Sequence, residues 1–255
     1  MLKQRKILAC VDQSPYADYV ADYAAWAARK LVLPLELLHI IDRHQETSAS
    51  TDHSGAIGVD AQENLLNQLT EEEGMRTRQV RDRGRVFLNG LRQRCEANEA
   101  ISVDTRQRYG QLLGTLEEQQ QDVALYVLGR RGESAAHTRR DLGRHVEMIS
   151  RQVRRPILTV AGEFVEPRSA LIAYDGKRMT RRCVELIAQN PKLNDIPVHV
   201  IMSGKRATDS DKHLQWAKDT LNTAGFSVET AYSPGDPEQE ITREIGERQA
   251  DLLGM

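Results

Sequence analysis

The chain has 255 residues, 28 % of them charged, and its 35 lysines and arginines against 37 aspartates and glutamates leave a formal net charge of −2. This balance excludes a globally basic nucleic-acid-binding protein, and no apolar run approaches the roughly 18 residues that a membrane-spanning helix needs. The length fits two domains that each bury a core of their own.

The cysteines and the N-terminus indicate the cellular setting. Cys10, Cys95 and Cys183 show neither a pairing pattern nor the spacing of metal ligands. The first strand pattern begins within a few residues of the N-terminus, which leaves no room for a signal peptide. Because thiols stay reduced in the cytoplasm, we expect a cytoplasmic protein.

The first 41 residues predict a strand, a helix and a second strand. KILACV (6–11) is a buried strand pattern that ends at Asp12. A helix with one apolar face follows as far as Leu31, and Ser14 can cap its free N–H groups. PLELLHII (34–41) predicts the next strand.

A long charged region follows. The sequence from about Asp60 to Ala97 predicts a helix, and because glycine weakens helices we expect it to be broken near Gly74, Gly84 and Gly90. A short strand over 102–107 and a helix over 112–120 complete this part of the chain.

The stretch from Asp122 to Val160 combines a strand, a glycine-rich turn, a helix and a strand. DVALYVLG (122–129) is an apolar strand pattern that runs into GRRGESAAHTRRDLGRH. Glycines let several backbone N–H groups point into one concavity, and the next helix adds the positive end of its dipole. This order is typical of α/β proteins and of phosphate-binding turns.

An internal repeat organises the chain. Asp175 stands 163 residues after Asp12, and Pro197 stands the same 163 residues after Pro34. Further on the offset becomes 125, and it pairs Val228 with Val103, Gly235 with Gly110 and Ile241 with Leu116. The sequence therefore predicts two related α/β domains, over residues 1–162 and 169–255, joined by a linker at 163–168.

The second copy reaches its fourth strand at Asp251, which we match with Asp122, and the sequence ends at Met255. A second glycine turn, last helix and last strand would have to follow. We therefore expect a truncated form of a longer tandem protein. An exposed strand edge beside an uncovered apolar face would make the chain oligomeric or leave its C-terminal half poorly ordered.

The strand ends, the glycine turn and their repetition resemble a tandem universal stress protein. The residues that carry the resemblance are ILACVD, LLHIID, DVALYVLGRRG and G-x12-PILTV. The resemblance implies two doubly wound parallel-sheet domains, with strand order 3-2-1-4-5 in the first and an incomplete sheet in the second. In such a sheet ligands bind beyond the carboxyl ends of strands 1 and 4, where Asp12 and Gly129 stand.

The resemblance also implies a ligand, ATP or another adenine nucleotide. Asp12 and the backbone at Ile40 would hold the base, and the candidate phosphate contacts are Gly129, Arg130, Gly132, Gly143 and Arg144. The spacing departs from the family pattern, because ten residues rather than nine separate Gly132 from Gly143. Arg144 stands where the family has a serine or threonine, and a charged guanidinium can replace that hydroxyl donor.

Other interpretations of these residues stay open. His39, His44 and His53 with Asp42 and Asp52 lie at no standard metal spacing, and a polar loop accounts for them. The arginines between 76 and 94 favour a solvated, salt-bridged helix rather than a nucleic-acid or membrane surface. No catalytic constellation can be assembled from sequence order.

Two functional classes therefore remain. One is a non-catalytic stress-response protein that binds a small anionic ligand in its first domain, and the other is a scaffold that has lost the ligand. A third and weaker class is an ATP-dependent enzyme of the wider nucleotide-binding α/β group. In the family the last strand commonly pairs across a boundary, which implies a homodimer or a pairing of the two domains.

Overall fold

The structure is a computed structural model that describes residues 5–41, 59–97, 101–130 and 144–255, with the backbone alone at 59–73 and 144–145. The chain divides into two compact units, Met1–Phe164 and Val165–Met255. Each unit is an α/β fold around a parallel sheet, and each is described by itself.

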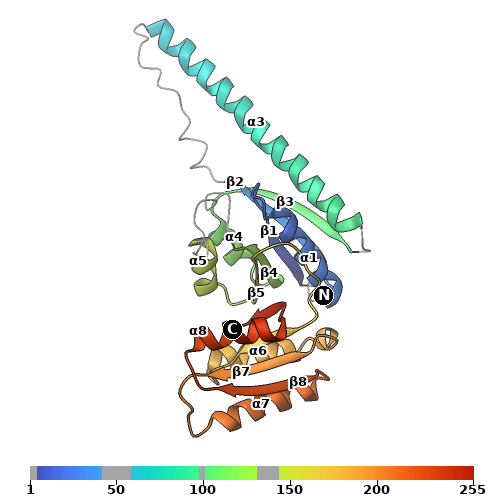
Figure 1. The fold of residues 1–255 in the computed structure, drawn as a ribbon. Helices are drawn as coiled ribbons and strands as arrows, with labels where there is room; N and C mark the ends of the chain where they lie inside the picture. Colours follow the sequence, from blue (N-terminus) through green and yellow to red (C-terminus); the bar gives the residue numbers. More distant parts are fainter. Residues whose placement is uncertain (1–4, 42–58, 98–100, 131–143) are drawn as a thin grey trace. The chain divides into compact units, whose positions relative to one another are not determined.

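The first unit contains a five-stranded parallel sheet (Figure 1). Its strands are β1 (Lys6–Cys10), β2 (Leu35–Ile41), β3 (Val103–Tyr109), β4 (Val123–Gly129) and β5 (Ile157–Val160). They pair in the order β3-β2-β1-β4-β5, and every pair is parallel. The predicted order 3-2-1-4-5 is confirmed.

Helices cover both faces of this sheet. On one face α1 (Ala17–Leu31) and α3 (Val59–Ala97) pack on a core that includes Ile7, Ala9 and Leu37. On the other face α4 (Leu112–Gln119) and α5 (Arg144–Gln152) pack on a second core that includes Leu8, Leu38 and Tyr126. Successive residues of a strand point to opposite faces, so an apolar run such as KILAC is what a strand buried on both sides requires.

Helix α3 contradicts the prediction of a broken helix. It is continuous over 39 residues and passes through all three glycines. Its sheet-facing positions recur every three or four residues and are buried at Gly84, Leu88, Leu91 and Cys95. At Gly84 an added Cβ would lie 2.2 Å from the Gln107 amide nitrogen and 3.3 Å from the His39 ring. This glycine therefore permits close packing on β2 and β3, which outweighs its weak helix propensity.

Substitutions at two of these glycines distinguish the effect of helix propensity from the effect of packing on the sheet. At Gly90 an added Cβ would meet nothing within 4 Å, so Gly90→Ala is expected to raise the free energy of unfolding by about 0.5–1 kcal/mol. Gly84→Val forces branched atoms against β2 and β3 and is expected to lower it by about 1–3 kcal/mol. Urea denaturation measures both, and equal effects at the two sites would contradict this packing.

The second unit contains a four-stranded parallel sheet in the order β8-β7-β6-β9. Its strands are β6 (Ala170–Ala173), β7 (Val198–Ser203), β8 (Val228–Ser233) and β9 (Leu252–Gly254). Helices α6 (Arg178–Ala188) and α7 (Ser210–Thr223) cover one face, a short 3-10 helix spans Pro191–Leu193, and α8 (Pro237–Arg248) contacts β6 and β7.

Strand register supports the internal repeat. Ile7 pairs with Leu35 in the first sheet, and Ala170 pairs with Val198 in the second, which preserves the offset of 163. Asp122 and Asp251 each stand one residue before the fourth strand, as we matched them. Within the fourth strand the match shifts by two residues. Leu125 pairs with Ile7, and Leu252 pairs with Ala170, which is the counterpart of Ile7. The shift arises from a register irregularity between Lys6 and Ile7 in the first sheet.

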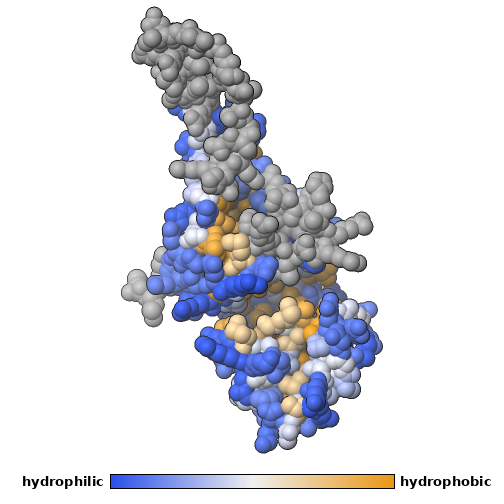
Figure 2. Space-filling model, turned by 90° about the vertical axis from the view of Figure 1, so that its left-hand side faces the viewer, coloured by the Kyte–Doolittle hydropathy of each residue, from blue (hydrophilic) through white to orange (hydrophobic). Residues whose placement is uncertain are grey.

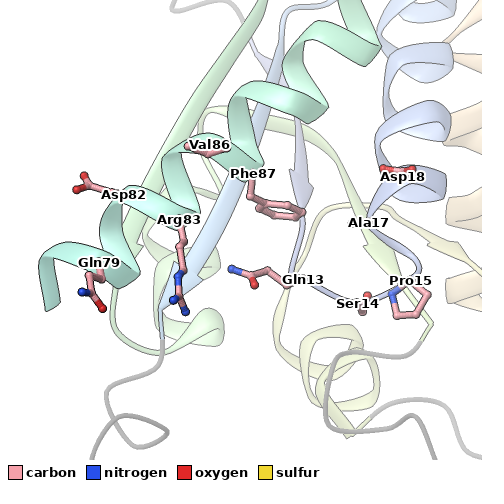
Figure 3. Close-up of a pocket in the computed structure, with 10 residues that line it drawn as sticks. All are labelled: Gln13, Ser14, Pro15, Ala17, Asp18, Gln79, Asp82, Arg83, Val86 and Phe87. Carbon is pink, nitrogen blue, oxygen red and sulfur yellow. The ribbon is translucent and has the colours of Figure 1, made fainter. Parts of the chain in front are cut away.

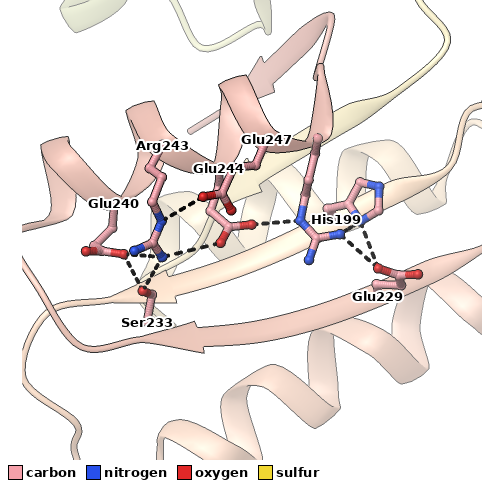
Figure 4. Close-up of polar contacts among 8 residues, drawn as sticks. His199, Glu229, Ser233, Glu240, Arg243, Glu244 and Glu247 are labelled. Atoms are coloured by element: carbon pink, nitrogen blue, oxygen red, sulfur yellow. Dashed lines mark hydrogen bonds and ion pairs between the residues drawn. The ribbon is translucent and has the colours of Figure 1, made fainter.

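A buried polar network lies at the amino-terminal edge of each sheet. In the first unit Lys6 Nζ lies 2.8 Å from both Glu36 Oε2 and Gln119 Oε1. The repeat offsets relate Glu36 to His199 and Gln119 to Glu244. In the second unit Arg248 lies 2.8 Å from His199 Nδ1 and 2.7 Å from Glu244 Oε2 (Figure 4). Both units thus place interacting polar side chains at matching positions, although Glu36 Oε1 and Gln119 Nε2 are buried without a hydrogen-bond partner among the described residues.

Helix α8 adds a second cation to this network. Arg243 lies 2.6 Å from Glu240 Oε2 and 3.0 Å from Ser233 Oγ, and it also approaches Glu244 and Glu247 (Figure 4). Arg248 further pairs with Glu229 at 2.9 Å, which lowers the pKa of that carboxyl. Opposite charges on one helix face and the adjacent strands hold α8 on the sheet.

The face of the molecule seen in Figure 2 is mostly polar where it is described. In the view of Figure 2, hydrophilic residues cover most of the described surface of each unit, and apolar residues emerge in smaller areas. Among the described helices none is long and apolar enough to cross a membrane.

Candidate functional site

The carboxyl edge of the first sheet contains the change of direction at which doubly wound α/β proteins bind ligands. β1 and β4 are neighbours, with Cys10 opposite Leu128. The chain leaves β1 toward α1 on one face, whereas α5, which follows β4, packs on the other face. Where two adjacent strands send their connections to opposite faces, the loops separate and leave a crevice beyond the strand ends.

Asp12 organises the loop that follows β1. Its Oδ1 accepts a hydrogen bond from the Ser14 N–H at 3.1 Å, and Ser14 Oγ accepts one from the Tyr16 N–H at 3.3 Å. The helix itself begins at Ala17, and its N-cap position, Tyr16, makes no side-chain cap. Ser14 thus satisfies a free N–H group just ahead of the helix, as predicted, although the regular helix begins at Ala17 and two successive side-chain turns precede it.

The second unit repeats this turn. Asp175 Oδ1 accepts the Lys177 N–H at 2.9 Å and the Thr180 hydroxyl at 2.7 Å. Burial opposes ionisation of this carboxyl, but the bonds from Thr180 and Lys177 outweigh it, so the pKa of Asp175 is lowered. The aspartate after the first strand thus has a structural role in both units.

Of the other candidate residues, Ile40, Gly129 and Arg130 are described by the structure, whereas the rest are described only in part or not at all. Ile40 lies in β2 beyond the level at which β1 ends, and its half-buried side chain packs on the core under α4 and α5. Gly129 is the last residue of β4 and pairs with Val160, whose carbonyl accepts the Arg130 N–H at 2.7 Å. Gly132 and Gly143 lie outside the described residues, and Arg144 is described only as the first residue of α5.

A groove opens beside Asp12, between the β1–α1 loop and α3 (Figure 3). The loop contributes Gln13, Ser14 and Pro15, and α3 contributes Arg83 and Phe87, whose side chains reach toward the loop. Sequence analysis missed this groove because it depends on where α3 crosses the sheet. Its apolar floor and flanking polar groups are the usual lining of a small-molecule site.

His39 of β2 lies between the end of β1 and Phe87 of the groove, and it contacts both. It is 8 % exposed, its Nδ1 lies 3.0 Å from the Val11 carbonyl oxygen, and its ring meets Phe87 edge-on at 5.5 Å. A carbonyl only accepts, so Nδ1 carries the proton. His39 therefore belongs to β2 rather than to a polar loop. His44, His53, Asp42 and Asp52 lie outside the described residues, within which no group of three or more His, Cys, Asp or Glu could hold a metal ion.

The corresponding position in the second unit is filled by side chains. The buried positions of α3 and α7 have the same spacing, and in that alignment Leu88 corresponds to Leu214. His213, one residue before Leu214, therefore corresponds to Phe87. A Cβ added to Gly176, the counterpart of Gln13, would lie 2.8 Å from the His213 ring.

Further contacts hold His213 in that place. Its Nε2 lies 2.9 Å from Asp209 Oδ2, and its Nδ1 lies 3.3 Å from Arg181, which stacks over Trp216 at 4.5 Å. The two copies therefore share the turn after the first strand but differ in the space beside it.

Cys10 lies in β1 close to this edge, and its surroundings disfavour the thiolate, the reactive form of the side chain. Burial and, to a lesser degree, Glu36 raise the pKa of the Cys10 thiol to about 12. Burial likewise raises the pKa of Cys95 to about 12 and also raises that of Cys183. A thiol reacts as its thiolate, so a pKa raised from 9.0 to about 12 suppresses the reactive form about a thousandfold near neutrality.

The raised pKa values of the native thiols predict how the cysteines react with an alkylating reagent. At pH about 8 the native protein should show almost no carbamidomethylation of Cys10 or Cys95 by iodoacetamide, whereas both should label fully after unfolding. Peptide mass spectrometry gives the extent at each site. Rapid labelling of Cys10 in the native protein would mean that the carboxyl edge of β1 is open to solvent at that residue.

Comparison with known proteins agrees with this architecture. Residues 3–161 match the model of the universal stress protein family. Universal stress protein Slr1230 of Synechocystis sp. is 31 % identical over 254 residues, which cover 98 % of this chain and 88 % of that protein. The chain belongs to the universal stress protein family.

Solved structures show the same fold. A universal stress protein from Archaeoglobus fulgidus has a TM-score of 0.60 at 14 % identity, covering 98 % of this chain and 84 % of that one. A functionally unknown protein from Pseudomonas aeruginosa, PA1789, has a TM-score of 0.53 at 18 % identity, covering 98 % and 80 %. At these identities the likeness concerns the fold alone.

Proposed function

We propose that this universal stress protein is a non-catalytic binding protein that takes ATP or another adenine nucleotide at the carboxyl edge of its first unit. The observation that carries the proposal is the adjacency of β1 and β4 in a parallel sheet, with Asp12 after one strand and Gly129 at the end of the other. Anionic ligands of α/β sheets bind at this position. The bound state is what a protein partner would read.

The proposed contacts follow from the chemistry of each residue. Asp12 accepts hydrogen bonds from the base; a carboxylate has about four acceptor positions, so the bond to Ser14 does not exhaust it. The backbone at Ile40 completes the base site. Among the described residues Gly129 and Arg130 begin the phosphate turn, which we extend to Gly132, Gly143 and Arg144 on the basis of sequence.

The proposal assigns the ligand to the first unit only. We take the nucleotide-binding domain as residues 1–162, a linker as 163–168 and the second domain as 169–255. In the second domain His213 occupies the space beside the turn at Asp175, and the packing of Arg181 on Trp216 holds that arrangement.

Thermal denaturation with and without ATP tests the proposal. A ligand present at about 100 times its dissociation constant stabilises the native state by about 2.7 kcal/mol, which raises the melting temperature by several degrees. We expect this shift with millimolar ATP. The absence of any shift in melting temperature would contradict nucleotide binding and favour the scaffold function.

A matched pair of substitutions tests the role of Asp12. Asp12→Ala and Asp175→Ala remove the same turn from the two units, and each is expected to lower the free energy of unfolding by about 1 kcal/mol. Only Asp12→Ala should also weaken ATP binding, measured by calorimetry. If both variants bind ATP as the parent does, Asp12 serves the turn alone.

The scaffold function keeps one specific observation in its favour. Helix α3 has 39 residues, many more than are needed to cover two strands of seven residues each. Such a helix offers a surface that a nucleotide site does not use.

A further inference from the structure

Helix α3 extends well beyond the sheet that it covers (Figure 1). At 1.5 Å per residue its 39 residues span about 58 Å, whereas the seven residues of β2 or β3 span about 23 Å. Its fully buried described positions lie between Gly84 and Cys95, in its C-terminal part. Most of the stability of a protein helix comes from the packing of one face against other elements, so a long helix that extends beyond its sheet is a candidate for packing on a partner.

The two parts of α3 carry opposite charge. Residues 59–73 contain five acidic residues, Asp60, Glu63, Glu71, Glu72 and Glu73, and no basic one. Residues 74–97 contain seven arginines against two acidic residues, Asp82 and Glu96. The helix therefore has an acidic segment (59–73) with a formal charge of −5 and a basic segment (74–97) with a formal charge of +5.

The side of the basic segment that faces away from the sheet is exposed among the residues that the structure describes. Met75 is 56 % and Val86 is 74 % exposed, and arginines flank them. Among the described residues no carboxylate forms an ion pair with Arg76, Arg78, Arg81, Arg83 or Arg85. Arg92 pairs with Glu96, and Arg94 pairs with Asp18 and Asp22 of α1.

We propose that α3 is a dimerisation helix that pairs antiparallel with α3 of a second copy of this chain. Within one continuous helix only residues three or four apart are neighbours, so apart from the junction near Glu73 the acidic segment cannot reach its own basic segment. A parallel pair would set like charges side by side. An antiparallel pair centred on Gly74 and Met75 sets each acidic segment beside the basic segment of the other copy, as a two-fold axis requires.

The centre of the pair suits a close crossing. A Cβ added at Gly74 would meet nothing within 4 Å, so the surface there is open, and glycine lets two helix backbones approach. Met75 beside it supplies a flexible apolar contact. Because α3 runs back along β2 and β3 from their carboxyl ends and Gly74 precedes Gly84 by ten residues, the centre of the pair lies beyond the carboxyl edge of the sheet (Figure 1). The pairing itself requires no bound nucleotide.

Complementary charge reversals test the pairing. One variant carries Arg78→Glu and Arg85→Glu, and the other carries Glu72→Lys and Glu73→Lys. Each should be monomeric where the parent is dimeric, with a dissociation constant raised at least about tenfold, because the reversed segment then keeps a formal charge of only +1 or −1 and most of the attraction between the two copies is lost. A 1:1 mixture should form a heterodimer, since each reversed segment then faces its complement.

A control separates this surface from a general charge effect. Lys192→Glu with Lys212→Glu makes the same change in net charge as the arginine variant, at exposed positions of the second unit, and should leave the dimer intact. Sedimentation equilibrium at tens of micromolar protein gives the association state, and circular dichroism checks the fold. Raising the salt from about 0.1 M to about 1 M shortens the Debye length from about 10 Å to about 3 Å and should weaken the dimer.

Three results would overturn the proposal. The parent chain could be monomeric at these concentrations, in which case the basic segment serves a different acidic partner. The charge reversals could leave a dimer intact, which would place the interface elsewhere. The mixed variants could fail to associate although both are folded, which would exclude antiparallel charge pairing.

Discussion

The structure of the first unit depends on the burial of β1 on both faces. Ile7, Leu8 and Ala9 are each fully buried, between α1 and α3 on one side and α4 and α5 on the other. Because β1 is paired in parallel with β2 and β4, all their carboxyl ends meet at one edge. In sheets whose adjacent strands connect to helices on opposite faces, ligands bind beyond the strand ends, and the proposed ligand would lie there.

The second unit shows what this scaffold retains when the edge changes. The parallel order of its first three strands, the turn at Asp175 and the polar network at the amino-terminal edge are all present again. The difference lies beside the turn, where His213 packs against Gly176 in place of an open groove. A core constrains every residue that faces it, whereas a loop edge tolerates change, so the two copies diverged where a ligand would bind.

The sequence predicted the strands, their order and the internal repeat, because apolar runs and repeat offsets are local patterns and the resemblance supplied the topology. It failed where tertiary packing decides. The glycines of α3 indicated a break, yet Gly84 is the residue that lets α3 approach Gln107. The groove beside Asp12 and the bond from His39 to Val11 join segments distant in sequence, and no local pattern marks such contacts. The phosphate contacts at Gly132 and Gly143 stay predictions.

Hydrogen–deuterium exchange with and without saturating ATP tests the central claim directly, because it reports on both units in one experiment. The account predicts slower exchange in the peptides that contain Val11–Ser14, Ile40 and Gly129–Arg130, and unchanged exchange around Tyr174–Lys177 in the second unit. Equal protection of both turns, or protection of neither, would contradict the claim that the carboxyl edge of the first sheet alone binds the nucleotide.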